Sequence, residues 1–151
     1  MGAGIARPLG LEGVYMSKVD HPLPAGAKFA REFFVSQAVY EGFIHTFNDR
    51  NPYHVNDEAA RAKGFSGKIM HGNILNGFLS YFIGECLPVK SVVIQSQEIK
   101  FHKPVYLNDT VTLSAEVADF HESVKTAEIS FHFLNQNNIK VARGKMFIGL
   151  L

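Results

Sequence analysis

Apolar residues recur along the chain with two spacings, which predict helices in its first half and strands in its second half. Between 73 and 83 the apolar positions are 74, 75, 78, 79, 82 and 83, the spacing of one helix face. The same kind of spacing from 39 to 47 predicts an earlier helix, with Ser36 as its N-cap. A short helix capped by Asn56 is expected through residue 62.

Strand patterns occupy most of the remaining chain. Alternating residues predict one strand over 28–35, and runs rich in branched and aromatic residues predict four more, separated by polar turns. These four runs are 92–101, 110–119, 124–134 and 139–148. The apolar helix and the sheet each need a partner to bury their apolar faces. The expected class is therefore α+β, an antiparallel sheet of about five strands wrapped around a central apolar helix.

The length of the chain suits one domain. A chain of 151 residues can bury roughly 68–70% of its unfolded surface in a single core. We expect one domain over 28–151, preceded by a glycine- and proline-rich arm over 1–27. Two origins stay open for residues 1–15: native sequence, or an artificial extension ahead of a natural start at Met16.

Composition argues against several classes of partner. The formal net charge is +1, which gives no strong field for nucleic acid or an anionic membrane. No apolar run has the length of a signal peptide or of a membrane span. Cys86 is the only cysteine, so the chain forms no internal disulfide. We expect no nucleic-acid or membrane partner and a cytoplasmic location, with a mitochondrial one left open.

Asp49 and His54 are the first candidate reacting groups. On one continuous helix, residues five apart would point about 140° away from each other. Between them, Asn51-Pro52 breaks the helical pattern, because proline excludes its preceding residue from the helical region. The resulting turn lets the carboxylate and the imidazole converge on one water as a general acid/base unit.

Gly72 is the second candidate, because it stands where the apolar helix begins. A helix N-terminus presents unpaired N–H groups and the positive end of the helix dipole. Glycine lets a ligand carbonyl approach the backbone closely. Such a helix end suits a developing oxyanion.

These motifs resemble the (R)-specific enoyl-CoA hydratases and MaoC-like dehydratases. That family carries its catalytic pair in an Asp-x-Asn-Pro-x-His motif, which here occupies 49–54, and its central helix opens with a His-Gly pair that matches His71 and Gly72. Ala60 also fits the motif, and Ser80 stands where many members place a serine beside the catalytic acid. The segment 101–105 is similar to the family's Phe-x-x-Pro-Val strand ending.

The resemblance implies a hot-dog fold and a function. Asp49 and His54 would hold the water that adds to a trans-2-enoyl thioester, giving an (R)-3-hydroxyacyl thioester, and Gly72 would bind the thioester carbonyl. Asn51, His71 and Ser80 would bind substrate or support the pair. The reaction needs no cofactor, and the substrate is carried by coenzyme A or acyl carrier protein. Family members pair as dimers that extend the sheet, so we expect a homodimer or a larger homo-oligomer.

Two positions depart from the family pattern without removing a reacting group. Asn48 replaces the usual glycine before the aspartate, and asparagine tolerates left-handed backbone angles. Tyr53 replaces the usual aliphatic residue before the histidine. Its ring either narrows the acyl pocket or packs on the neighbouring helix.

Other interpretations of the same residues stay open. A thioesterase of the same fold also places a helix N-terminus at the thioester carbonyl, and an acyl-thioester binding module would keep the pocket without turnover. The Asp49/His54 pair favours the hydratase over both. Asn51 is expected to shape the turn, and Ser80 is about as well explained by an ordinary helix serine bonded to the backbone. A metal site of His45, Asp49 and His54 is rejected because a third firm ligand spacing is missing.

Overall fold

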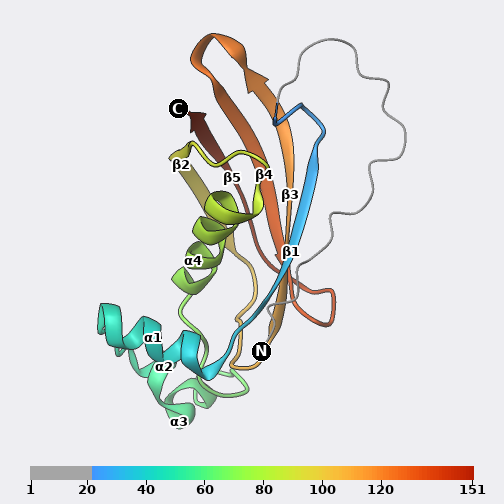
Figure 1. Ribbon diagram of the computed structural model, residues 1–151. Helices are drawn as coiled ribbons and strands as arrows, with labels where there is room; N and C mark the ends of the chain where they lie inside the picture. The colour runs from blue at the N-terminus through green and yellow to red at the C-terminus, as the bar shows by residue number, and fades with distance from the viewer. Residues whose placement is uncertain (1–21) are drawn as a thin grey trace, which may run out of the picture.

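The computed structural model describes residues 22–151, so residues 1–21 of the expected arm lie outside the described residues. Five strands and four α-helices follow one another along the chain in the order shown in Figure 1. The α-helices are α1 (Gln37–Phe47), α2 (Pro52–Val55), α3 (Asp57–Arg61) and α4 (Asn73–Tyr81). The strands are β1 (Lys28–Phe34), β2 (Val92–Phe101), β3 (Thr110–His121), β4 (Thr126–Leu134) and β5 (Lys140–Leu150). The predicted α+β class is confirmed.

The five strands form one antiparallel sheet in the order β1-β3-β4-β5-β2. The hairpins β3–β4 and β4–β5 pair strands that are neighbours in sequence, whereas β1 and β2 reach the two edges by longer connections. A 3₁₀ turn, Glu122–Val124, includes Val124, the first residue of the run predicted as the third long strand. The strand therefore begins at Thr126, after Lys125 has taken a left-handed conformation.

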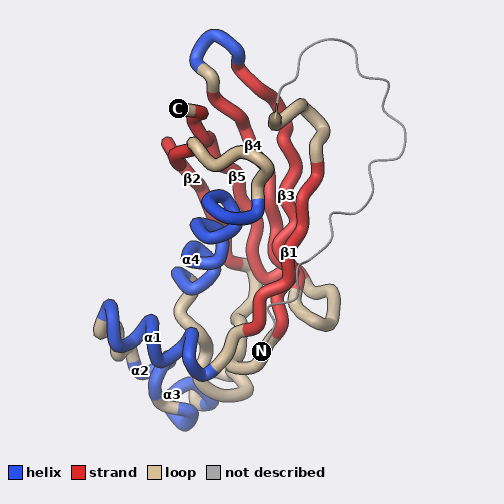
Figure 2. Tube along the Cα trace, in the orientation of Figure 1, coloured by secondary structure: helices blue, strands red, loops and turns tan. Residues whose placement is uncertain are grey.

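Helix α4 packs against one face of the sheet, while α1, α2 and α3 gather beyond one end of it (Figures 1 and 2). The buried residues of α4, which are Ile74, Leu75 and Leu79, join the inward-facing residues of the strands in one core. On β3 these are Val111, Leu113, Ala115 and Val117, all at most 5% exposed. The alternation along β3 is the period of two expected of a strand with one buried face. The prediction of a sheet packed around the apolar helix is confirmed.

The ends of the helices follow the side chains that cap them. The Ser36 hydroxyl accepts a hydrogen bond from the Val39 N–H at 3.2 Å, and the Asn56 side chain accepts one from Ala59 at 3.0 Å, as predicted. At its other end α4 continues into one π-helical turn, Phe82–Cys86. Among residues 22–151, no helix has the length and apolar character that crossing a membrane requires.

Candidate active site

The site begins where α1 ends. Asn48 takes φ 53° and ψ 28°, the left-handed conformation, and its N–H bonds the Ile44 carbonyl at 2.7 Å. Asparagine adopts this conformation more readily than most residues, because its short polar side chain can hydrogen-bond locally. The expectation that Asn48 preserves the turn is confirmed. The chain leaves α1 at this residue and places Asp49 directly after it.

Asn51 organises the turn between Asp49 and α2. The carboxylate Oδ1 of Asp49 accepts the Asn51 N–H at 3.1 Å, and the Asn51 side chain accepts the Tyr53 N–H at 3.1 Å. Asn51 is the N-cap of α2, and Pro52 occupies its first turn, where a missing N–H costs nothing. Asn51 therefore shapes the turn, as predicted, and brings Asp49 and His54 to the same side of it.

His54 is held by hydrogen bonds at its ring and at its backbone carbonyl. Its Nδ1 lies 2.8 Å from the Ile69 carbonyl oxygen, and its own backbone carbonyl accepts the Tyr40 hydroxyl at 2.7 Å. A carbonyl oxygen can only accept, so Nδ1 carries the hydrogen of the neutral ring and Nε2 keeps the lone pair. The hydrogen-bond pattern gives the imidazole the tautomer that a general base requires.

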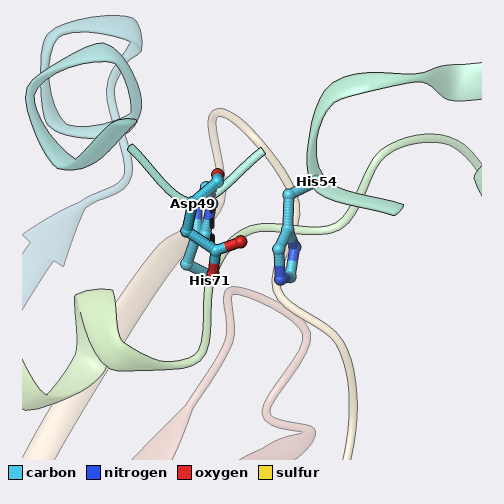
Figure 3. A group of neighbouring side chains, drawn as sticks. All are labelled: Asp49, His54 and His71. Atoms are coloured by element: carbon cyan, nitrogen blue, oxygen red, sulfur yellow. Dashed lines mark hydrogen bonds and ion pairs between the residues drawn. The ribbon is translucent and has the colours of Figure 1, made fainter. Parts of the chain in front are cut away.

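His71 is the third member of the cluster, shown with the other two in Figure 3. Its Nε2 lies 2.9 Å from the Asp49 backbone oxygen and 4.0 Å from the Asp49 carboxylate. The His54 and His71 rings lie 4.1 Å apart between centroids. One side-chain ligand atom of each of the three residues lies within 4.8 Å of the others. The structure thus brings together the predicted pair and the histidine that opens α4.

Gly72 stands at the head of α4 with no capping side chain. The helical bonds begin with Ile74 and Leu75, whose N–H groups bond the His71 and Gly72 carbonyls at 3.0 Å each. The N–H groups ahead of them are the orphan donors of a helix N-terminus. A Cβ on Gly72 would lie 3.0 Å from the Phe101 ring, closer than ordinary packing allows. A side chain at position 72 would therefore oblige the Phe101 ring to shift away from this helix end.

Two cavities meet at the site, and both are lined by Phe43, Asp49, Asn73 and Ile74. One has a volume of about 450 Å³ and extends past His54, His71 and Gly72 to the loop after β2. The other, of about 720 Å³, runs between α1 and α4 and is largely apolar. Its remaining lining residues are Val39, Gly42, Thr46, Phe47, Asn76, Gly77 and Phe78. Asp49 therefore lies where an apolar channel meets the helix N-terminus.

Two of the sequence-based candidates are placed differently from the others. Ser80 is exposed on α4 and lines neither cavity, and no hydrogen bond joins it to Asp49 within residues 22–151. Eight residues of α-helix separate it from Gly72, a rise of about 12 Å. The expected contact of Ser80 with the acid is not formed in the single chain. Tyr53 also lines neither of these two cavities.

The cluster of possible metal ligands in the structure differs from the set considered from the sequence. Among residues 22–151, Asp49, His54 and His71 lie close enough to share an ion, so the group differs from the set rejected above by having His71 in place of His45. His45 is exposed in the last turn of α1, before the chain turns at Asn48. In the observed cluster His54 and His71 each already donate one ring N–H to a backbone carbonyl.

Sequence reasoning missed three supporting contacts. The Ile69 carbonyl accepts from the His54 ring, and the Tyr40 hydroxyl donates to the His54 backbone carbonyl. The Phe43 ring lies 4.5 Å from the His71 ring between centroids. Helical spacing placed Phe43 on the inner face of α1, so a weak signal existed for that residue. A backbone carbonyl carries no sequence signal at all.

Comparisons with known proteins place the chain in a family. Residues 24–135 match the family model for the MaoC like domain. The (R)-specific enoyl-CoA hydratase of Rhodospirillum rubrum is 39% identical over 87 residues, covering 55% of this chain and 60% of that protein. The enzyme of the same name from Aeromonas caviae is 26% identical over 124 residues, covering 82% of this chain and 91% of that protein.

A solved structure shares the fold. The (R)-hydratase from Aeromonas caviae aligns with a TM-score of 0.79 at 26% identity, over 85% of this chain and 98% of that one. The antiparallel sheet packed around α4 is accordingly the hot-dog fold. The family match covers well over half of the sequence, and the chain belongs to the MaoC-like domain family.

Proposed function

We propose that this protein catalyses the reversible addition of water to a trans-2-enoyl thioester, giving an (R)-3-hydroxyacyl thioester. The observation that carries the proposal is the convergence of the Asp49 carboxylate and the His54 ring beside the N-terminus of α4. Two relatives are named (R)-specific enoyl-CoA hydratase, and a third, from Methylorubrum extorquens, is named 3-hydroxybutyryl-CoA dehydratase.

Asp49 and His54 hold the water in this proposal. The carboxylate and the His54 Nε2 lone pair accept the two hydrogen bonds of one water molecule. The water oxygen bonds to C3 as the C2–C3 double bond opens, and the proton that the pair takes up is returned to C2 on the same face. The reverse sequence removes water. Oxygen and hydrogen balance without any redox change, so no nicotinamide or flavin is needed.

The head of α4 stabilises the charge that develops during the addition. As electrons move toward the thioester, its carbonyl oxygen becomes enolate-like. The Gly72 N–H, ahead of the first helical bonds, donates to that oxygen. One oxyanion donor of this kind commonly contributes about 10²–10³-fold in turnover.

The chain should act as a homodimer in the cytoplasm. Strand β2 is an edge of the sheet and exposes Val93, Ile94 and Phe101, the last at 52%. An exposed apolar edge strand offers unpaired backbone groups to a second strand. A second copy of the chain would cover this edge.

The test follows the enoyl absorbance of crotonyl-CoA and of longer trans-2-enoyl-CoAs, with chiral analysis of the product. Formation of the (R)-alcohol supports the proposal. Release of free thiol without hydration would favour a thioesterase. If neither occurs, the same assay with enoyl-acyl carrier protein decides between a carrier preference and a binding module without turnover.

A further inference from the structure

His71 contacts both members of the pair from a buried position. Its side chain is 2% exposed, and its Nε2 lies 2.9 Å from the Asp49 backbone oxygen. Its ring stacks at 4.1 Å on His54 and at 4.5 Å on Phe43, tilted by 35° and 30°. This histidine therefore joins two catalytic candidates that lie in different turns of the chain.

The contacts also assign the tautomer of His71. Because the Asp49 carbonyl can only accept, the His71 Nε2 must carry a hydrogen. Its Nδ1 is buried and finds no hydrogen-bond partner among the described residues. A hydrogen there would be buried without an acceptor, which is costly, whereas a lone pair is tolerated better. The Nε2–H tautomer fits both atoms.

Asp49 has few other anchors. Its carboxylate is 49% exposed, and within residues 22–151 its Oδ1 accepts only the N–H of Asn51, two residues away. The turn before it depends on a left-handed Asn48. The hydrogen bond from His71 is thus the long-range contact that ties this turn to the head of α4.

We propose that His71 is a positioning residue, which holds the Asp49 backbone by hydrogen bonding and the His54 ring by stacking. This inference rests on the proposed function, since the pair that His71 positions is the pair that holds the water. Misplacing a reacting group by about 1 Å can cost about 10²-fold in rate. His71 would therefore act on turnover more than on substrate binding.

The test compares His71→Leu, which cannot donate, with His71→Gln, whose amide can donate to the Asp49 carbonyl. His121→Leu, on the exposed end of β3, is the matched control. We expect His71→Leu to lose about 10- to 100-fold in kcat with KM within about twofold, His71→Gln to recover part of kcat, and the control to match the unmodified enzyme. Circular dichroism checks that each variant is folded.

Full turnover in His71→Leu, or no recovery in His71→Gln, overturns the proposal. A second measurement does not depend on activity: a proton–nitrogen correlation spectrum of the imidazoles in the unmodified protein, assigned with His71→Gln, reports the tautomer. The Nε2–H form supports the proposal, and the Nδ1–H form overturns it. If the unmodified protein hydrates no enoyl thioester, the proposed function fails while this spectrum still decides the His71 contact.

Discussion

The Nδ1 atom of His54 lies 2.8 Å from the backbone oxygen of Ile69, on the loop that leads into α4. This contact ties α2 to the segment that ends at the helix N-terminus. It also leaves Nε2 as the ring nitrogen with a lone pair in the neutral form. Nδ1 of His54 thus makes the structural hydrogen bond, and Nε2 is left for the proposed chemistry.

The variant His54→Asn separates the hydrogen bond made by Nδ1 from the basic function of Nε2. The asparagine amide can replace Nδ1–H as the donor to Ile69, but it offers no base at the position of Nε2. We expect kcat to fall about 10²–10⁴-fold, the usual contribution of a positioned acid/base group, with little change in the melting temperature. Steady-state kinetics and thermal melts check this. An active His54→Asn would show that Nε2 is not needed.

Gly77→Leu tests which cavity takes the acyl chain. Gly77 lines the apolar cavity between α1 and α4, and a Cβ built on it meets nothing within 4 Å. The leucine side chain should fill part of the cavity without a backbone clash. We expect kcat/KM for crotonyl-CoA to stay within about threefold, while longer enoyl-CoAs lose at least about tenfold, or about 1.4 kcal/mol of transition-state stabilisation.

A uniform loss across chain lengths would contradict that use of the cavity. Gly84→Leu is the matched control, because Gly84 also has nothing within 4 Å of an added Cβ and lines neither cavity. This variant should leave the chain-length profile unchanged.

Much of the fold could be predicted because its signals are local. Helix α4 follows from apolar spacing, and the caps at Ser36 and Asn56 follow from residues whose side chains bond nearby N–H groups. The order of the strands could not be predicted in the same way. Strand β2 pairs with β5, some 40 residues further along, and only packing of the whole sheet selects that partner.

In the site, too, the local features could be predicted from the sequence and the long-range contacts could not. The turn at Asn51 and Pro52 is local, and it correctly predicted that Asp49 and His54 converge. The hydrogen bond from His71 to the Asp49 carbonyl joins residues 22 positions apart and involves a backbone atom. The expected contact of Ser80 with Asp49 came from a motif position, which gives no measure of distance along α4, and within residues 22–151 Ser80 is exposed and lines neither cavity.

Protonation of His132 should lower the free energy of unfolding in acid. Partial burial and, to a smaller extent, the charge of Lys140 lower the pKa of His132 below 6.5. The unfolded chain therefore takes up this proton at a higher pH than the folded one, so stability falls as the pH drops from 6.5 through the lowered pKa. Arg143, directly opposite on β5, adds a further positive charge on this part of the sheet.

His132→Gln should remove that part of the acid sensitivity. Urea unfolding of both proteins at pH 7.5 and pH 5.5 measures it. We expect a smaller loss of unfolding free energy for the variant between the two pH values. Equal losses would show that His132 does not contribute.

Metal chelation should leave the activity unchanged. Asp49, His54 and His71 lie close enough to share an ion, but the proposed reaction uses only their hydrogen bonds and proton transfers. Dialysis against EDTA, followed by the hydration assay with and without added Zn²⁺, checks this. A loss that Zn²⁺ restores would show that the cluster is a metal site.

Asp49→Asn tests the central claim most directly. The amide keeps the size of the side chain and can still accept the Asn51 N–H, but it cannot take up a proton. Asp119→Asn, the same change on the exposed end of β3, is the control. The measurement is kcat for hydration of crotonyl-CoA by the folded proteins. The account predicts a loss of about 10²–10⁴-fold in Asp49→Asn and none in the control; unchanged turnover in Asp49→Asn would contradict it.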